Sequence, residues 1–309
     1  MGFPDFFVSS HFMKKFLKDA VDSAASVAKV IMMSRGSRKP MPVDQTREIV
    51  ILGNGPSLRQ TMEKDRDYLM SRSRMAVNFA ALTEEFRELR PDYYIMIDAL
   101  MFPVLSPFPP DEDSRAGHLW RCLHEVDWPM TLFVPVVWME AARKLLGDNR
   151  NVTLCPLNLT PVEGWRWLTH ALFRRGLGMP RPRNVLIAAV MAAIWEGFGR
   201  ILLAGADHTW SHTMRVDSQN RICMAVEHFY SDDHAKEDLK VAEAYRGVHI
   251  HDVYQSLSIA FRSYFHIREY ADSRGVRIVN ISPVSMIDAF PRGEFPDPFF
   301  EPDEPFPGS

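Results

Sequence analysis

A glycine-rich turn after a short apolar run is the feature of this sequence that most clearly suggests chemistry. The run Ile49–Leu52 is too short for a helix and is typical of a buried parallel strand. Positions 53–57 then read Gly-Asn-Gly-Pro-Ser, so glycines that let the backbone approach a ligand stand beside polar side chains and the start of a helix near Leu58. We therefore expect a nucleotide-binding turn, although it has neither the Lys-Ser or Lys-Thr ending of a P-loop nor the full dinucleotide fingerprint. An ordinary structural turn is the alternative.

Short strand-like runs alternate with helical stretches between residues 44 and 290. The expected strands are Ile49–Gly53, Met75–Phe79, Tyr93–Asp98, Thr131–Val137, Val152–Leu157, Ile201–Gly205 and Val276–Ile281. The expected helices are Leu58–Met70, Leu82–Leu89, Met139–Leu146, Val162–Phe173, Val185–Phe198 and Asp252–Ser273. This alternation predicts a Rossmann-like α/β fold with a doubly wound, mostly parallel sheet.

Ligands of such sheets bind at the carboxyl ends of the strands, around the point where the strand order reverses. The candidate binding residues therefore follow the expected strands: Gly53, Asn54, Gly55, Ser57, Asn78, Asp98, Asp207, His208, Ser282, Pro283 and Ser285. For Asp207, a helix cap or a hydrogen bond that closes the sheet end is an equally good explanation.

A long polar segment, residues 208–236, follows the strand that ends at Gly205 and is predicted to be a lid-like insertion. Its titratable and aromatic residues are His208, Trp210, His212, Arg215, Asp217, His228, Tyr230, Asp232, Asp233 and His234. Such a connection is a good place for chemistry, although a solvated loop can have the same composition. The proline-rich residues 103–113 are expected to form a second loop that can border the site.

The composition is that of a globular protein, and 36 basic against 39 acidic residues argue against a general nucleic-acid-binding surface. Three widely spaced cysteines, Cys122, Cys155 and Cys223, have no CxxC spacing, which argues against a disulfide framework or a zinc knuckle. We therefore expect core thiols in a reducing cytoplasm, and no signal peptide is evident.

Residues 1–43 are expected to form an amphipathic helix and a linker. Between Phe6 and Met33, apolar residues recur at helical spacing, but charges interrupt them too often for a helix that spans a bilayer. The helix is expected to lie peripherally on the inner face of the cytoplasmic membrane, to form a homo-oligomer contact, or to pack on its own domain. Residues 44–290 form the expected catalytic domain, and residues 291–309 form an expected proline-rich, acidic tail.

An ordered set of short motifs resembles the bacterial sialyltransferases that act on lipooligosaccharide. It also resembles the broader group related to the archaeal 6-hydroxymethylpterin pyrophosphokinase and to flagellin-modifying proteins. The motifs are Gly53–Leu58, Asn78, Arg90–Asp98, Gly197–Asp207, His228–Tyr230 and Ile281–Ser285, spread over about residues 47–290. The resemblance implies an inverting glycosyltransferase that uses a CMP-linked sugar, needs no metal in the chemical step and employs a histidine base.

The resemblance also implies roles for individual residues. It makes the turn with Asn54, Gly55 and Ser57 the holder of the donor nucleotide, Asn78 a contact of the cytidine or its phosphate, and Ser282-Pro283 with Ser285 a second nucleotide-contacting turn. His228 matches the catalytic histidine and is followed by an aromatic pair that includes Tyr230. An imidazole with a pKa near neutrality can take the proton of an acceptor hydroxyl as it attacks the anomeric carbon. A histidine in a surface loop is the alternative for His228.

The sequence departs from the sialyltransferase pattern in two places. A threonine-serine-glycine turn precedes a long helix in those enzymes, whereas this chain has Arg183-Asn184-Val185, which makes Asn184 the candidate binding residue there. Tyrosines that stabilise the departing phosphate have no clear counterparts, and His212 and Arg215 could supply charge instead. The donor-sugar pocket must therefore differ, and the donor sugar stays open.

The expected function is a glycosyltransferase-like enzyme of bacterial cell-envelope polysaccharide or glycoconjugate synthesis. It would take a nucleotide-activated sugar, CMP-linked by preference, and a glycan or glycolipid acceptor, with no metal ion required and no nucleic acid as a partner. One alternative is a magnesium-dependent diphosphotransferase that uses ATP, in which Asp98, Asp207 or Asp217 would hold the metal. Another is a non-catalytic partner in envelope assembly that keeps the nucleotide turn.

Overall fold

A seven-stranded parallel sheet forms the centre of the computed structural model, which describes residues 4–39, 41–102, 114–223 and 247–294, and side chains from Met13 onward. The strands are β1 (Asp44–Leu52), β2 (Ser73–Val77), β3 (Tyr93–Ile95), β4 (Met130–Pro135), β5 (Val152–Leu157), β6 (Phe198–Ala204) and β9 (Arg277–Asn280). Their spatial order is β5-β4-β3-β2-β1-β6-β9, and every neighbouring pair is parallel. The predicted Rossmann-like α/β fold is confirmed.

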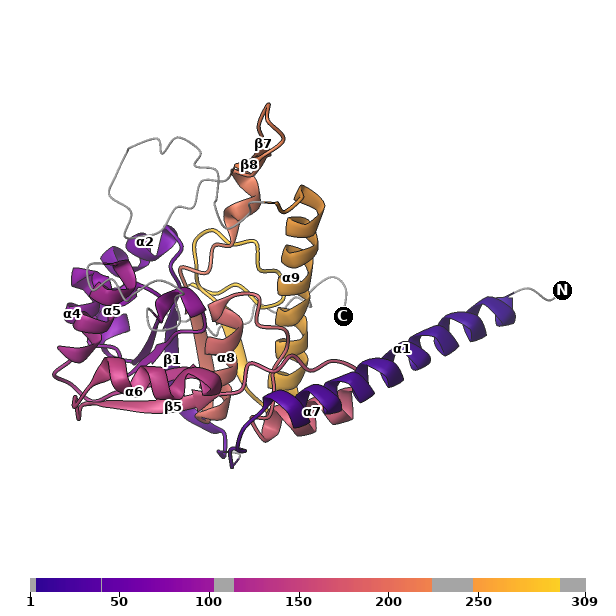
Figure 1. Cartoon of the computed structure of the whole chain (residues 1–309), viewed down its shortest axis with the longest axis horizontal. Helices are drawn as coiled ribbons and strands as arrows, with labels where there is room; N and C mark the ends of the chain where they lie inside the picture. The colour runs from indigo at the N-terminus through magenta and orange to yellow at the C-terminus, as the bar shows by residue number, and fades with distance from the viewer. Residues whose placement is uncertain (1–3, 40, 103–113, 224–246, 295–309) are drawn as a thin grey trace.

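Helices cover both faces of this sheet (Figure 1). They are α1 (Pro4–Met33), α2 (Ser57–Lys64), α3 (Arg66–Met70), α4 (Glu84–Leu89), α5 (Arg115–His124), α6 (Met139–Leu146), α7 (Arg166–Arg174), α8 (Val185–Trp195) and α9 (Ile250–Ser273). Short 3-10 turns are η1 (Ala80–Leu82), η2 (Ala99–Met101), η4 (Val136–Trp138) and η5 (Thr209–His212).

The side chains of β1 show why the sheet needs two helical layers. Ile49 and Ile51 pack in the core that contains α8 and α9, whereas Val50 and Leu52 pack with α2 on the other face. Successive side chains of a strand point to opposite faces, so a strand buried on both sides must be apolar at every position. Helix α8 is buried at every residue from Val185 to Trp195, which explains its uniformly apolar sequence.

The strand order reverses between β1 and β6. Strands β2 to β5 lie on one side of β1, and β6 and β9 lie on the other, so the turns after β1 and β6 leave the same edge of the sheet side by side. This is the topological switch point at which such sheets bind ligands.

Several helix boundaries differ from the sequence predictions. The helix expected over Leu58–Met70 is broken at Asp65, whose backbone has a φ of −123° and ends α2. The helix expected from Val162 begins only at Arg166, because the Val162 N–H bonds to the Met179 carbonyl and Gly164 has a φ of +113°.

Helix α5, the 3-10 turn η5 and a small hairpin were not predicted. Helix α5 starts where the Ser114 hydroxyl accepts the Gly117 N–H at 3.0 Å, and it buries Leu119, Trp120 and Leu123. The described part of the lid-like segment forms η5 and a hairpin of β7 (Arg215–Val216) and β8 (Ile222–Cys223). The remainder of that segment, the expected loop 103–113 and most of the expected tail lie outside the described residues.

Helix α1 is attached through its second half, and its first half extends away from the sheet (Figure 1). Ser23 and Ser26 are buried, and the Ser26 hydroxyl makes two hydrogen bonds with the backbone of Glu163, at 2.8 and 2.9 Å. The segment expected as a linker is packed as well, since Arg38 forms a 2.6 Å ion pair with Glu196. The expected helix is present and contacts its own domain. The side chains of residues 4–12, Phe6 and Phe12 among them, lie outside the described part.

Candidate functional site

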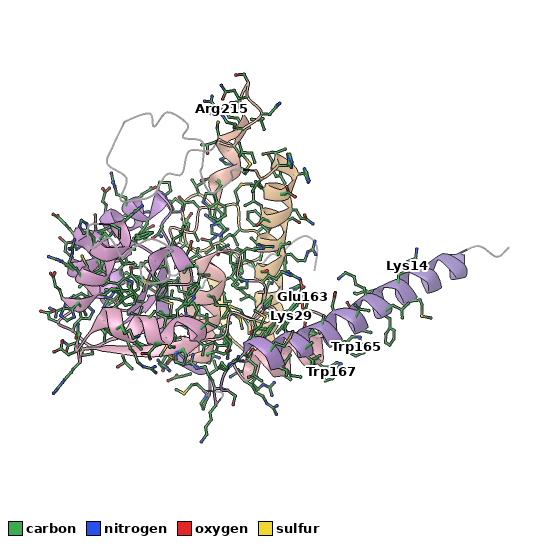
Figure 2. The ribbon with its side chains drawn as sticks, viewed as in Figure 1. Lys14, Lys29, Glu163, Trp165, Trp167 and Arg215 are labelled. Atoms are coloured by element: carbon green, nitrogen blue, oxygen red, sulfur yellow. The ribbon has the colours of Figure 1, made fainter. Side chains whose placement is uncertain are left out.

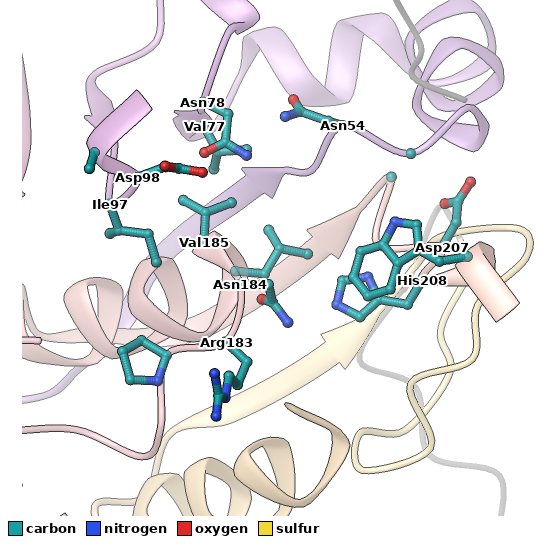
Figure 3. A pocket seen from close by; sticks show the side chains of 16 residues that line it. Asn54, Val77, Asn78, Ile97, Asp98, Arg183, Asn184, Val185, Asp207 and His208 are labelled. Atoms are coloured by element: carbon teal, nitrogen blue, oxygen red, sulfur yellow. The ribbon is translucent and has the colours of Figure 1, made fainter. Parts of the chain in front are cut away.

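A cavity of about 360 Å³ lies at the carboxyl ends of the strands next to the switch point. Figure 3 shows its wall: Asn54 comes from the turn after β1, Asn78 and Asp98 follow β2 and β3, and Arg183 and Asn184 precede α8. The candidate binding residues that line it are Asn54, Gly55, Asn78, Asp98, Asn184, Asp207 and His208. The structure thus gathers into one cavity residues that are far apart in the sequence.

The glycines of the turn after β1 allow two backbone segments to approach each other. A Cβ atom at Gly53 would lie 2.4 Å from the Gly205 carbonyl oxygen, and one at Gly55 would lie 2.5 Å from the Asp207 Cγ. Backbone bonds of 2.7 and 2.9 Å join Gly53 to Ala204 and Gly55 to Gly205. Gly53 packs against the β6 turn and is not among the residues that line the described cavity, so its part in ligand binding stays a prediction.

Asp207 fixes this turn from the β6 side. Its carboxylate accepts the backbone N–H of Ser57 at 2.9 Å and also accepts the Ser57 hydroxyl, which places a negative charge at the start of α2. Burial raises the pKa of Asp207, and the two bonds from Ser57 oppose that shift. The helix-cap explanation is the one the geometry supports, because both carboxylate oxygens are engaged with Ser57.

His208 is a buried and uncharged histidine. It has a left-handed backbone, with a φ of 54°, and burial lowers its pKa from 6.5 to about 3. Its Nε2 lies 2.6 Å from the hydroxyl oxygen of Tyr264, and its ring packs 4.2 Å from the Trp210 ring, centroid to centroid. A neutral imidazole in these contacts positions its neighbours and does not serve as a positive charge for a phosphate.

Asn184 presents a free donor to the cavity. Its Oδ1 accepts the Ile187 N–H at 3.2 Å, which caps α8, and the Tyr264 hydroxyl at 3.0 Å. These two donors fix the orientation of the amide, so the Tyr264 oxygen must accept the N–H of His208. The Nδ2 atom of Asn184 is buried and has no hydrogen-bond partner among the described residues.

Asn54 presents the complementary group. Its Oδ1 is also buried without a hydrogen-bond partner in the described part of the chain, and Asn54 lines the same cavity. A buried polar atom left without a partner costs about 1–3 kcal/mol. A ligand that accepts from Asn184 and donates to Asn54 would recover that free energy, so the cavity is suited to a polar ligand.

The other cavity residues add charge and shape. Arg183 is exposed, and among the described residues of the cavity wall it is the one with a permanent positive charge. Asp98 is exposed at the rim, where its Oδ1 accepts the Leu100 N–H at 2.9 Å. Asn78 has a φ of 54°, a left-handed conformation that asparagine tolerates better than most residues.

The turn at Ser282-Pro283, with Ser285, packs against the turn after β6, on the side away from the cavity. The buried Ser282 hydroxyl accepts the Ala206 N–H at 2.8 Å, and the Ser285 hydroxyl donates to the Ala206 carbonyl at 2.6 Å. Pro283 between them is exposed and, like both serines, is absent from the cavity wall. These residues hold the β6 turn from outside the described cavity wall, and their direct contact with a nucleotide stays a prediction.

The structure does not bring the expected charge-supplying residues to the cavity. His212 and Arg215 are exposed and absent from its wall, and Arg215 lies on the hairpin that projects beyond the rest of the described chain (Figure 2). Neither residue lines the cavity formed by the described residues, and their role as phosphate contacts stays a prediction. His228 and Tyr230 lie outside the described residues.

Sequence reasoning missed the site roles of Arg183 and Tyr264. The sequence marks Arg183 only as a departure from a family motif, and the aromatic residues around Tyr264 are typical of core packing. Tyr264 is in the core, yet its hydroxyl joins His208 to Asn184. The sequence signal available in this region was Asn184, because an asparagine directly before an apolar run is a typical helix cap. It indicates the start of α8 beside Arg183.

The described residues contain neither a metal-binding cluster nor a membrane-spanning helix. No cluster of three or more His, Cys, Asp or Glu side chains with metal-binding geometry is found in the described part of the chain. Within the same residues, no helix combines the length and apolar character needed to cross a bilayer.

No protein-family model matches this chain, and no curated protein matches it. Among solved structures, the chain is similar to one described as the MAf glycosyltransferase from Magnetospirillum magneticum AMB-1, with a TM-score of 0.43 and 13% sequence identity. The similarity covers 90% of this chain, which spans only 38% of the length of that protein. A similarity at this level does not define an activity.

Proposed function

We propose that this protein is a glycosyltransferase-like enzyme that binds a nucleotide-activated sugar in the cavity at the switch point. The observation that carries the proposal is the pair of unpartnered amide groups, Asn54 Oδ1 and Asn184 Nδ2, on the wall of that cavity. A nucleotide offers both hydrogen-bond donors and acceptors, and a cavity of about 360 Å³ is within the usual size range of small-molecule sites.

Arg183 is the proposed partner of the donor phosphate. A guanidinium group forms charge-assisted hydrogen bonds with phosphate oxygens and stabilises the negative charge that develops as the nucleotide leaves. Arg183 would then supply the charge that was expected from His212 and Arg215. We keep the CMP-linked sugar as the preferred donor, and a glycan or glycolipid of the cell envelope as the acceptor.

His228 stays the proposed general base, with Tyr230 beside it in the sequence. In the transfer step the base would take the proton of the acceptor hydroxyl, the hydroxyl oxygen would bond to the anomeric carbon, and the bond to the nucleotide phosphate would break. His208 does not fit this task, because its Nε2 is engaged with Tyr264 and its imidazole is buried.

The binding step is tested by thermal shift with CMP, CDP, UDP, GDP and ATP, each with and without magnesium, because a ligand of the native state raises the melting temperature. We expect stabilisation by CMP or CDP without metal. Arg183→Ala should weaken that binding about ten- to hundredfold, the range for a lost charge-assisted hydrogen bond. Arg143→Ala, on the exposed side of α6, is the matched control and should bind normally.

The other outcomes separate the alternatives. Stabilisation only by ATP with magnesium would favour diphosphate transfer, and no shift with any nucleotide would favour a non-catalytic envelope-assembly role. His228→Gln then tests the chemistry: it should retain nucleotide binding and lose sugar transfer to the acceptor. Equal transfer by His228→Gln and the unmodified protein would remove His228 as the base.

A further inference from the structure

An apolar stripe on α1 is largely exposed among the described residues, and of its large side chains only Phe16 has a ring contact there, with Trp165. Its large side chains are Met13, Phe16, Leu17, Val21 and Ile31, and the last two are 68% and 74% exposed. At 3.6 residues per turn these positions fall on one broad side of the helix. We call this stripe, together with Trp165 and Trp167 at the start of α7, the amphipathic platform.

The remaining contacts of α1 fix the direction in which the stripe faces. Ser23 and Ser26 are buried against residues 163–165, where the Ser23 hydroxyl accepts the Trp165 N–H at 2.9 Å. The fit is close, since a Cβ atom at Gly164 would lie 2.3 Å from the Ser23 hydroxyl oxygen. The side of α1 that carries Ser23 and Ser26 therefore packs against the domain, and the apolar stripe faces away from it.

Aromatic residues of α7 extend the stripe. The rings of Phe16 and Trp165 lie 5.7 Å apart, and those of Trp165 and Trp167 stack at 6.2 Å. Figure 2 shows both tryptophans beside the same stretch of α1, and Trp167 is 68% exposed. Tryptophan combines a large apolar ring with a polar N–H group, which suits the boundary between lipid headgroups and acyl chains.

Charge around the platform has the opposite sign to that of the rest of the chain. Residues 13–39 and 163–175 carry ten basic and three acidic side chains, which leaves 26 basic and 36 acidic residues elsewhere. Three ion pairs of 2.6 Å involve these residues: Lys18 with Asp22, Arg38 with Glu196 and Glu163 with Arg181, so the excess of basic over acidic groups remains. Figure 2 shows Lys14 toward the outer end of α1 and Lys29 near the end of α1 that joins the domain.

We propose that the amphipathic platform docks this protein on an anionic lipid surface, with α1 lying in the plane of the surface. The apolar stripe would enter the boundary between headgroups and acyl chains while the surrounding lysines and arginines contact lipid phosphates. A second copy of the chain would bring another basic platform against this one, which like-charge repulsion opposes. The basic residues around the stripe therefore favour an anionic lipid surface over a second copy of the chain.

Vesicle co-sedimentation of the full chain tests the proposal, with phosphatidylcholine alone or mixed with phosphatidylglycerol. We expect binding to the anionic vesicles, weaker binding as salt rises, and a loss of about tenfold or more in Val21→Glu, which puts a charge into the stripe. Val137→Glu is the matched control. Val137 is 70% exposed on η4, so this variant makes the same chemical change on a surface outside the platform. Circular dichroism would confirm that both variants fold.

Three results would overturn the proposal: no binding to any vesicle, equal binding to neutral and anionic vesicles, or equal loss in Val21→Glu and Val137→Glu. Light scattering distinguishes the competing occupant. An oligomer that dissociates in Val21→Glu, together with no vesicle binding, would assign the stripe to a second copy of the chain. The outcome does not depend on nucleotide binding, so it is separate from the proposed activity.

Discussion

At the scale of residues, the site depends on a hydrogen-bond chain that begins in the core. The His208 imidazole donates to Tyr264, Tyr264 donates to Asn184, and the Asn184 amide presents its free N–H group to the cavity. A core tyrosine therefore sets the polarity of a cavity residue 80 positions away in the sequence.

Removal of the Tyr264 hydroxyl tests this series of hydrogen bonds. Tyr264→Phe should lower the free energy of unfolding by about 1–3 kcal/mol, because the His208 N–H is left buried without an acceptor. Urea denaturation at neutral pH measures the effect, with Tyr254→Phe as the control because Tyr254 is exposed on the same helix. Equal stability of the two variants would show that the hydroxyl contributes nothing.

The buried histidine also predicts a pH dependence. Its pKa is lowered from 6.5 to about 3, so between these values the unfolded chain binds a proton that the native protein excludes. The free energy of unfolding should therefore fall as the pH is lowered through this window, by up to about 1.4 kcal/mol per pH unit from this group. His208→Asn tolerates the left-handed backbone and should show a flatter curve.

The control for this experiment is His251→Asn, since His251 is exposed. Its stability should change with pH in parallel with that of the unmodified protein when both are measured by denaturation at pH 4 to 7. Parallel curves for His208→Asn and the unmodified protein would contradict an uncharged, buried His208.

At the scale of elements, the turns after β1 and β6 form one unit. Gly55→Ala should lower the free energy of unfolding by about 2 kcal/mol or more, the range for overpacking, because its Cβ would meet Asp207 and the Gly205 backbone. Gly36→Ala meets open space and should cost only about 1 kcal/mol for its positive φ. Denaturation measures both, and a cost at Gly55 no larger than at Gly36 would contradict the close packing.

The sequence predicted the sheet well, because strands buried on both faces must be continuously apolar, as Ile49–Leu52 and Ile201–Leu203 are. Helix α5 was missed since its start depends on the Ser114 cap and follows a proline-rich stretch that favours a loop. The position of Arg215 could not be predicted, because the direction of a hairpin is set by tertiary contacts. The partners Asn184 and Tyr264 meet only after α8 and α9 have packed together.

At the scale of the whole molecule, the platform and the cavity are connected through few residues. The Ser26 hydroxyl bonds to the Glu163 backbone, the Glu163 carboxylate pairs with Arg181, and the Arg181 carbonyl accepts the Arg183 N–H at 2.9 Å beside the cavity. A change in how firmly α1 is held could therefore reach Arg183, the proposed partner of the donor phosphate, through these few contacts. Thermodynamic linkage makes any such coupling reciprocal. If a lipid surface raises the affinity for the donor by some factor, the donor must raise the affinity for the surface by the same factor.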